Sequence, residues 1–400
     1  MLQLLISLIL GFSLIIWILF LFFTIWNYKN MPNLSKEYNK KLYSQQPLIT
    51  VIIPTRNEEN RIKKCIETLK LQTYPNLEFL IVDASTDKTI DVIKSIIKDD
   101  NRFKIIKQRE LPAEWIGKPH ALQQGSEYAN GQWLLFIDAD TYYDPNIISK
   151  TVEHVLKNDL DMLSLVANNI CVSFWEKVIQ PIPLAGLSIL SMSSKINNPK
   201  SKMAVAYGPF ILIKHSVFKK IDGYNKIKSH IGDDVELAKL VKSSGYKIGL
   251  ANGYSMMKIR MYQGLKDIWE GWSKNIFLGI TQKREIKRKS ALILFLIIGL
   301  LGIFVLMVFP TILLIISIIF IILTKSTYWN NIFIISLLTW LVSILGLVYA
   351  QHCYKIGKKR YAPLSLFLGG LIIMGIFFNS AYNALLKKGI KWRGRTYYST

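Results

Sequence analysis

The chain has 400 residues, of which 51% are hydrophobic, and 50 Lys and Arg against 27 Asp and Glu give it a formal net charge of +23 at pH 7. Long runs without charge exclude an evenly patterned soluble enzyme, and the aromatic and β-branched content excludes a disordered chain. The three cysteines are too scattered for a zinc site or a disulfide framework, which favours a reducing compartment.

The first predicted element is a membrane anchor over residues 1–28, a stretch without any charged residue. Leu4 to Trp26 is long enough to cross a hydrocarbon core of about 30 Å at about 1.5 Å per residue. A cleaved signal peptide is the alternative, but no basic start and no small-residue cleavage site are present. The lysines that follow the span predict that the middle of the chain lies in the cytoplasm, at the cell membrane.

Residues 46–255 alternate short β-branched runs with amphipathic stretches, which is typical of βαβ units around a mostly parallel sheet and predicts an α/β fold. The expected strands are 48–54, 77–83, 103–107 and 133–138, and the expected helices are 58–70, 87–98, 118–129 and 145–157. Ligands bind such sheets beyond the carboxyl ends of the strands, so we expect the polar turns at 54–58, 83–87 and 138–140 to form one site.

The first two of these turns carry groups that suit a nucleotide. Pro54, Thr55, Arg56 and Glu58 lie where the first strand ends, so backbone amides and polar side chains could meet the nucleotide there. Asp83 ends the second strand, where its carboxylate could accept a hydrogen bond from a base N–H. For each turn alone, ordinary capping of the next helix explains the residues equally well.

The third turn, Asp138-Ala139-Asp140, follows the apolar strand 133–137 with two carboxylates one residue apart. Mg²⁺ or Mn²⁺ needs one or two carboxylates when phosphate oxygens and water complete its shell, so this turn is a candidate metal and diphosphate site. The alternative is a turn that caps the helix after Asp144.

Two further segments could act on the reacting groups. Lys118 lies at the start of an expected helix, where its ammonium and the helix N-terminus would attract donor phosphates. Asp233 and Asp234 are adjacent at the start of another helix, and repulsion between them would raise the proton affinity of one and suit it to general base catalysis. A solvated lysine and plain helix capping are the respective alternatives.

Residues 262–277 place aromatic side chains on one broad helical face with lysines around it. This pattern is typical of a helix at the membrane interface, and we expect the interfacial region to extend over residues 256–290. Trp269, Trp272 and Lys274 are the candidates to meet a lipid acceptor. Packing and membrane contact are the alternative roles of these three residues.

The motifs in this order resemble the family 2 glycosyltransferases, inverting sugar-nucleotide enzymes with a GT-A fold, over about residues 46–285. The resemblance implies that residues 54–58 line the nucleotide, that Asp83 contacts the base and that Asp138 and Asp140 hold Mg²⁺ or Mn²⁺ on the diphosphate. It also implies that Asp234 is the base and that Lys118 assists, although Asp233 stands where Glu is more usual.

A narrower resemblance is to the membrane-anchored subgroup near hopanoid- and carotenoid-associated glycosyltransferases. It is carried by Trp115 to Leu122, Tyr262 to Asn275 and Lys391 to Arg395. The chain lacks the Gln-x-x-Arg-Trp motif of the processive polysaccharide synthases in this family, which argues against polymer extrusion.

Three more charge-free runs follow in a predicted membrane region over 291–386, before a basic tail at 387–400. The first run contains Pro310 and is predicted to be either a tight hairpin or one kinked helix. Most of the excess positive charge flanks these runs, where lipid headgroups would lie, so we expect no nucleic-acid partner. The loop at 355–360 and the tail cannot both be cytoplasmic if one full span separates them.

These observations predict an enzyme that moves one sugar from a UDP- or GDP-sugar to a lipid acceptor, through a hydroxyl or carboxyl group of that lipid. The carboxylate pair at 233–234 favours a hydroxyl, because a hydroxyl must lose its proton as the sugar bond forms. A polyprenyl-phosphate glycosyltransferase and a non-catalytic membrane scaffold that keeps the fold are the alternatives.

Overall fold

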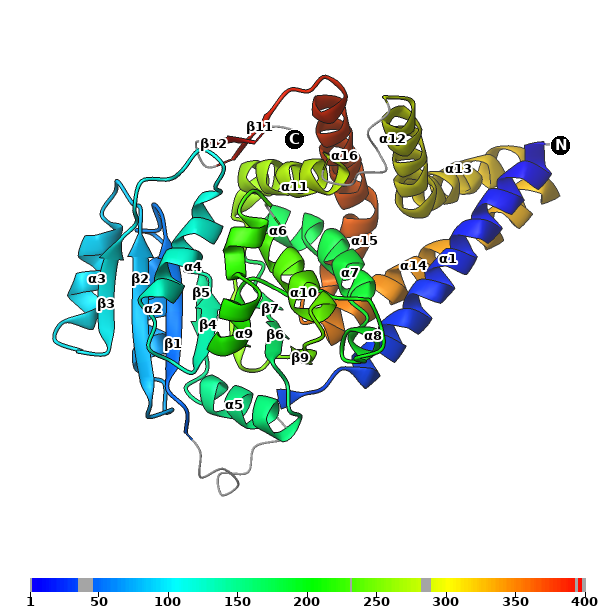
Figure 1. The fold of residues 1–400 in the computed structure, drawn as a ribbon. Helices are drawn as coiled ribbons and strands as arrows, with labels where there is room; N and C mark the ends of the chain where they lie inside the picture. The colour runs from blue at the N-terminus through cyan, green and yellow to red at the C-terminus, as the bar shows by residue number, and fades with distance from the viewer. Residues whose placement is uncertain (1, 35–45, 231, 282–288, 393–394, 398–400) are drawn as a thin grey trace. The chain divides into compact units, whose positions relative to one another are not determined.

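The structure, a computed structural model, describes residues 2–34, 46–230, 232–281, 289–392 and 395–397. It consists of two compact units. We call residues 30–169 and 191–261 the α/β unit, and residues 1–29, 170–190 and 262–400 the helical unit. Figure 1 labels the elements of both units.

A seven-stranded sheet in the order β3-β2-β1-β4-β8-β6-β9 is the centre of the α/β unit. All of its neighbouring strands pair in parallel except β8, which runs antiparallel to both β4 and β6. The predicted mostly parallel sheet is therefore confirmed. The strands are β1 Ile49–Thr55, β2 Leu77–Asp83, β3 Phe103–Lys107, β4 Trp133–Ile137, β6 Met162–Val166, β8 Phe210–Lys214 and β9 Ile248–Asn252.

The strands near the middle of the sheet are buried on both faces, which is why they read as continuous apolar runs in the sequence. Helices alternate with the strands as predicted, and the observed bounds differ from the expected ones by a few residues. The helices of this unit are α2 Ile62–Lys70, α3 Thr89–Ile97, α4 Gly117–Glu127, α5 Ile147–Lys157, α8 Ser193–Ile196, α9 His215–Lys220 and α10 Asp233–Ser243.

A small second sheet extends the edge where β4 ends. It has the order β5-β10-β7, formed by β5 Thr141–Tyr143, β10 Met257–Ile259 and β7 Asn168–Asn169. Because side chains alternate along a strand, Thr141 and Tyr143 share one face of β5 and both are buried, while Tyr142 points to the other face.

The described residues of the helical unit form four helical segments long and apolar enough to cross a membrane: Leu2–Asn30, Ser290–Thr324, Thr327–Cys353 and Lys359–Leu385. Their outward side chains are largely exposed apolar residues, as expected for a lipid-facing surface. The helices of this unit are α1 Leu2–Asn30, α6 Phe174–Ile179, α7 Pro181–Leu190, α11 Gly264–Thr281, α12 Lys289–Ile303, α13 Phe309–Thr324, α14 Thr327–Cys353, α15 Ala362–Leu364 and α16 Gly370–Leu385. A hairpin of β11 Ile390–Trp392 and β12 Arg395–Tyr397 follows α16.

The run that contains Pro310 is one helical path with a sharp bend, so of the two predicted forms the kinked helix is correct (Figure 1). A π-helical turn, Phe304–Val308, separates α12 from α13. Pro310 has no N–H, so it cannot donate to the carbonyl oxygen of Leu306, four residues earlier. The indole N–H of Trp17 donates to this oxygen instead, at 2.9 Å.

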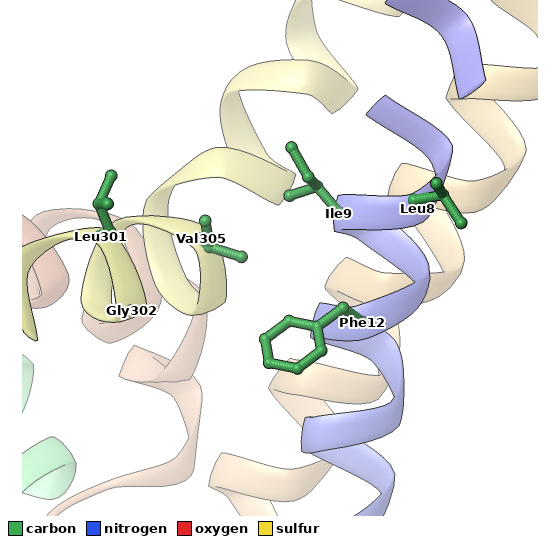
Figure 2. Close-up of a pocket in the computed structure, with 6 residues that line it drawn as sticks. All are labelled: Leu8, Ile9, Phe12, Leu301, Gly302 and Val305. Carbon is green, nitrogen blue, oxygen red and sulfur yellow. The ribbon is translucent and has the colours of Figure 1, made fainter. Parts of the chain in front are cut away.

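Helices α1 and α14 run side by side in the same direction. Thr339 lies by Leu10, Gly346 by Trp17 and Tyr354 by Asn27, so contacts advance together along both helices. The loop after α14 therefore lies at the end of α1 from which the chain continues into the α/β unit. Between α1 and α12 lies an apolar groove of about 340 Å³ (Figure 2), lined by Leu8, Ile9, Phe12, Leu301, Gly302 and Val305.

Candidate active site

The carboxyl ends of β1 and β2 lie together as the sequence predicts. Thr55 and Asp83 are paired in register, and the Thr55 hydroxyl donates to the Asp83 carboxylate at 2.7 Å. The backbone N–H of Ser85 donates to the other oxygen of the same carboxylate at 3.1 Å. Asp83 is thereby fixed at the end of the sheet, and only 8% of its surface is exposed.

The turn after β1 is bound to the turn after β2. The N–H of Asn57 donates to the Ser85 hydroxyl at 2.9 Å, and the N–H of Glu58 donates to the Thr89 hydroxyl at 2.8 Å. Arg56 is exposed, Pro54 is half-buried and Glu58 is buried. The first two predicted turns therefore form one continuous surface, and their contact with a nucleotide stays a prediction.

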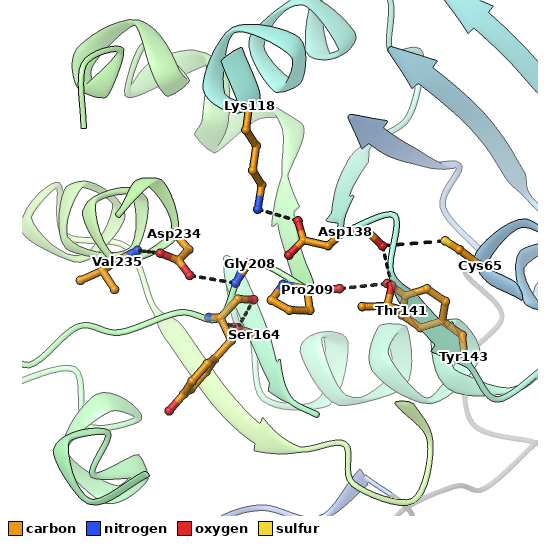
Figure 3. Close-up of polar contacts among 11 residues, drawn as sticks. Cys65, Lys118, Asp138, Thr141, Tyr143, Ser164, Gly208, Pro209, Asp234 and Val235 are labelled. Atoms are coloured by element: carbon orange, nitrogen blue, oxygen red, sulfur yellow. Dashed lines mark hydrogen bonds and ion pairs between the residues drawn. The ribbon is translucent and has the colours of Figure 1, made fainter. Parts of the chain in front are cut away.

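Asp138, which follows β4, forms an ion pair with Lys118 from the first turn of α4, with 2.6 Å between Nζ and Oδ1 (Figure 3). Both side chains are partly exposed, at 33% for Lys118 and 25% for Asp138, so small molecules can reach the pair. The sequence analysis expects both residues near the donor phosphates, and the structure brings them into direct contact.

Asp234 reaches the same place from the first turn of α10. Its carboxylate accepts hydrogen bonds from the N–H of Gly208 at 3.0 Å and from its own neighbour Val235 at 2.8 Å. Asp233 beside it is buried, and its Oδ2 has no hydrogen-bond partner among the described residues. Two backbone amides thus fix Asp234, whereas one oxygen of Asp233 lacks a partner.

Gly208 has no side chain at the point where these groups converge. A Cβ atom at this position would lie 2.8 Å from Lys118 Nζ and 3.5 Å from the carboxylates of both Asp138 and Asp234. Glycine here leaves the space that the ammonium occupies between the carboxylates.

Burial by itself lowers the pKa of a lysine and raises the pKa of an aspartate, so it acts in opposite directions on the two kinds of charge in this cluster. Burial by itself would lower the pKa of Lys118, but Asp138, Asp233 and Asp234 outweigh it and hold that pKa above its usual range. Burial raises the pKa of Asp233 to about 7, with Lys118 opposing the shift and the neighbouring carboxylates adding to it. The pKa of Asp234 is raised for the same reason, opposed by Lys118 and the two amides.

The raised pKa of Asp233 predicts that this residue destabilises the fold at alkaline pH. Its usual pKa is 3.8, so between about pH 4 and 7 the folded protein binds more protons than the unfolded chain, and stability falls as the pH rises through this range. We expect Asp233→Asn to raise the melting temperature of the purified protein at pH 8 by several degrees, and by much less at pH 5.

Asp99→Asn is the matched control for this measurement, because Asp99 is exposed and belongs to no ion pair in the described chain. It should shift the melting temperature equally little at both pH values. A melting temperature of Asp233→Asn that follows the wild-type pH dependence would contradict the prediction.

Asp140 acts electrostatically on Tyr142 and Cys65. Burial is the largest cause that raises the pKa of Tyr142, and the charge of Asp140 raises it further. The pKa of the buried Cys65 thiol is raised by the same two causes. The Cys65 Sγ lies 3.8 Å from the Asp138 carbonyl oxygen, so the turn 138–140 lies over this thiol.

The donors at this turn fit a metal ion that takes most of its ligands from a substrate. Among the described residues no three His, Cys, Asp or Glu side chains form a metal site by themselves. Two reachable carboxylates are nevertheless sufficient for Mg²⁺ or Mn²⁺ when diphosphate oxygens and water complete the shell. The residues thus fit a metal that arrives with its nucleotide.

The three acceptor candidates lie on α11 in the helical unit. That helix begins at Gly264, so Tyr262 precedes it instead of lying on its face. Trp272 is buried, and its indole N–H donates to Gln180 at 2.8 Å. Trp269 packs where α16 passes at Gly375, and Lys274 is half-buried. Their predicted role toward a lipid acceptor stays a prediction.

The structure adds residues that sequence reasoning missed. Gly208 and Pro209 precede β8, and Ser164 on β6 exchanges hydrogen bonds with the backbone of Tyr207 at 2.8 and 3.2 Å. A Gly-Pro pair before an apolar run indicates a turn. Nothing in that pattern indicates that the turn meets Asp234, because the contact depends on how β8 crosses the sheet.

Residues 50–222 match the family model described as glycosyl transferase family 2. Residues 50–222 are therefore similar to the family 2 glycosyltransferases. The 4,4'-diaponeurosporenoate glycosyltransferase of Staphylococcus aureus strain USA300 is 26% identical over 249 residues, which are 60% of this chain and 64% of that protein. The protein of the same name from strain MRSA252 is 26% identical over 243 residues. The match thus spans less than two thirds of these relatives.

A solved structure of the mannosyltransferase PcManGT from Pyrobaculum calidifontis, in complex with GDP-Man and Mn²⁺, is similar to this structure over 95% of this chain and 99% of its own. The TM-score is 0.53 at 16% sequence identity. The likeness extends over the α/β unit and the helical unit, and it confirms the predicted GT-A fold with apolar helices at both ends of the chain.

Proposed function

We propose that this family 2 glycosyltransferase is a membrane-bound inverting enzyme that transfers one sugar from a UDP- or GDP-sugar to a lipid acceptor. The observation that carries the proposal is the convergence of Asp138, Asp233 and Asp234 on Lys118 beyond the carboxyl end of β4. This is the edge at which open α/β sheets bind their ligands. The names of the relatives, which indicate a lipophilic acid as acceptor, support a lipid acceptor here.

The proposed reaction is a single in-line displacement at the anomeric carbon. Asp234 takes the proton of the acceptor hydroxyl, the acceptor oxygen forms a bond to that carbon, and the bond to the diphosphate oxygen breaks with its electron pair. Asp234 suits this step because its pKa is raised by burial while two amides keep its carboxylate in place. Lys118 is placed to move from Asp138 to the departing diphosphate, whose negative charge it would neutralise.

Asp138 and Asp140 are the residues that would hold Mg²⁺ or Mn²⁺ on the donor diphosphate. When bound there, the ion supplies positive charge that stabilises the leaving group. The neighbouring Thr55, Asp83 and Ser85 form the part of the edge assigned to the nucleoside.

We place the α/β unit on the cytoplasmic side of the cell membrane. The lysines after α1 support this orientation, and nucleotide sugars are made in the cytoplasm. Because α14 runs parallel to α1, the basic loop after α14 lies on the side of the membrane at which α1 ends, and the α13–α14 turn lies on the side at which α1 begins.

The decisive experiment is to incubate membranes containing the full chain with labelled UDP- and GDP-sugars and to extract the lipid product. A metal-dependent glycolipid in which the sugar is attached to a hydroxyl or carboxyl oxygen is the expected result. A sugar phospholipid product would instead identify a polyprenyl-phosphate glycosyltransferase. Absence of both transfer and sugar-nucleotide hydrolysis would indicate a non-catalytic scaffold.

A further inference from the structure

Four cations occupy the loop between α14 and α15. Lys355, Lys358, Lys359 and Arg360 are all exposed, and none of them forms an ion pair with a described carboxylate. The loop contains no acidic residue. It therefore presents concentrated positive charge at the end of the bundle where the chain enters the α/β unit.

The side of α6 packed against this loop adds aromatic rings and another cation. The Arg360 guanidinium lies 5.2 Å and the Lys177 ammonium 5.7 Å from the centroid of the Tyr361 ring. The centroid of the Phe174 ring lies 6.2 Å from the same point. Two cations against one ring repel each other, and an anion bound beside them offsets this repulsion.

Exposed apolar side chains lie next to the cations. Val172, Phe174 and Leu364 are 52%, 43% and 45% exposed. Aromatic and apolar groups beside lysines and arginines are typical of surfaces at the headgroup level of a membrane. A site for free phosphate would not need these apolar neighbours.

We propose that residues 355–361 and α6 form a binding surface for the phosphates of anionic lipids, on the side of the membrane at which α1 ends. Cations bind the lipid phosphates, while Val172, Phe174 and Leu364 contact the acyl region. This inference requires the membrane location but not the glycosyl transfer reaction.

The test is native mass spectrometry of the detergent-purified full chain, titrated with phosphatidylglycerol, phosphatidylcholine or inorganic phosphate. The fourfold variant Lys355→Gln, Lys358→Gln, Lys359→Gln, Arg360→Gln should bind phosphatidylglycerol at least tenfold more weakly than the wild type. The matched control neutralises four exposed lysines of the α/β unit, Lys94, Lys157, Lys219 and Lys220.

The control variant should keep the wild-type preference for phosphatidylglycerol over phosphatidylcholine. Equal binding of the two lipids by the wild type would overturn the proposal, as would an unchanged affinity of the fourfold variant. Displacement of the lipid by inorganic phosphate at equal concentration would identify a phosphate site instead and would also overturn it.

A different observation concerns the catalytic cluster. The Tyr143 hydroxyl donates to the carbonyl oxygen of Pro209 at 2.9 Å and is hydrogen-bonded to the Thr141 hydroxyl. The Thr141 hydroxyl also lies 2.6 Å from the carbonyl oxygen of Asp138. Figure 3 shows these contacts as a continuous chain from Asp138 to Pro209. Both hydroxyls are buried on one face of β5.

This chain of contacts through Thr141 and Tyr143 connects the Asp138 side of the site to the Asp234 side. One end is the backbone of Asp138, whose carboxylate pairs with Lys118, and the other end is Pro209, directly after the Gly208 N–H that holds Asp234. Each hydroxyl has one proton, so two of these three contacts are hydrogen bonds at any moment, and the pair of hydroxyl groups sets the spacing between the diphosphate side and the base side. A misplacement of the base by about 1 Å can cost about 10²-fold in rate.

We infer that Tyr143 and Thr141 are positioning residues that hold Asp234 relative to Asp138, an inference that rests on the proposed function. Tyr143→Phe should lower kcat about tenfold with little change in the KM for the donor. Thr141→Val should have a similar effect, Thr141→Ser should restore most of the rate, and the Thr141→Val/Tyr143→Phe double variant should lose little more than either single variant.

Tyr74→Phe is a closely matched control. Tyr74 is as buried as Tyr143, both being 5% exposed, and its hydroxyl donates to the carbonyl oxygen of another proline, Pro47, at 2.7 Å. Loss of that bond should lower the melting temperature about as much as Tyr143→Phe does, without lowering kcat. Equal kcat values for the two variants would overturn the inference.

Amide hydrogen exchange provides a readout that does not depend on turnover. The peptide containing the Gly208 N–H should exchange faster in Tyr143→Phe than in the wild type or in Tyr74→Phe. Unchanged exchange at Gly208 would overturn the inference even if the enzyme is active. A wild type without transferase activity, combined with faster exchange in Tyr143→Phe, would refute the proposed function and leave the positioning of Asp234 supported.

Discussion

Replacing Asp234 with asparagine is expected to lower kcat by about 10²- to 10⁴-fold, the usual contribution of a positioned general base. The asparagine side chain is isosteric, and its single carbonyl oxygen can still accept from one of the two amides, which bind different oxygens of Asp234, so the fold and the donor affinity should be kept. Initial rates of transfer at saturating donor, measured with the full chain in detergent, provide the test.

Asp99→Asn serves as the control for this variant, because it removes an exposed carboxylate that has no described ion pair. It should retain wild-type kcat. An unaltered kcat for Asp234→Asn would show that the acceptor group is already ionised, as in a carboxylate or phosphate, and would contradict the assignment of Asp234 as the base.

Removing either carboxylate of the turn after β4 is expected to cost at least about 10²-fold in rate, because charge stabilisation of the leaving group is the largest contribution to such a reaction. The two variants should differ in how they respond to metal. Asp138→Asn also deprives Lys118 of its partner, whereas Asp140→Asn leaves the 2.6 Å ion pair between Lys118 and Asp138 in place.

Rates measured over a range of Mn²⁺ concentrations separate these effects. For Asp140→Asn, a higher half-saturating Mn²⁺ concentration should accompany the loss of rate. Lys118→Met is the companion variant, and it should lower the rate without changing the Mn²⁺ requirement. Wild-type turnover by Asp140→Ala would show that this carboxylate is not part of the site.

The half of the sheet formed by β1, β2, β3 and β4 could be predicted from the sequence, because each of these strands is an apolar run followed by its own helix. Parallel pairing then places the ends of β1 and β2 side by side, which is why the contact between Thr55 and Asp83 follows from the pattern. Lys118 and Asp234 are candidates because of their places at helix starts, and the family resemblance favours their functional roles over plain solvation and capping.

The remaining part of the site depends on contacts between distant segments, which no local pattern encodes. Strand β8 enters the sheet between β4 and β6 against the direction of both, and this crossing is what brings Gly208 to Asp234. The different neighbours of Asp138 and Asp140, Lys118 for the first and Cys65 and Tyr142 for the second, also depend on three-dimensional packing.

The bend at Leu306 has a consequence for how this enzyme meets bilayers of different thickness. Without it, the 35-residue segment Ser290–Thr324 would be a rod of about 52 Å, far longer than a hydrocarbon layer of about 30 Å. Because the segment is bent, its two halves pack against different helices: α13 packs against α14, and α12 packs against α16. Helix α16 in turn bonds to α11 through Asn379 and Ser273, and α11 continues the chain directly from the catalytic unit. A change in lipid thickness around α13 is therefore transmitted through this bend to α12, and from there to α16 and α11.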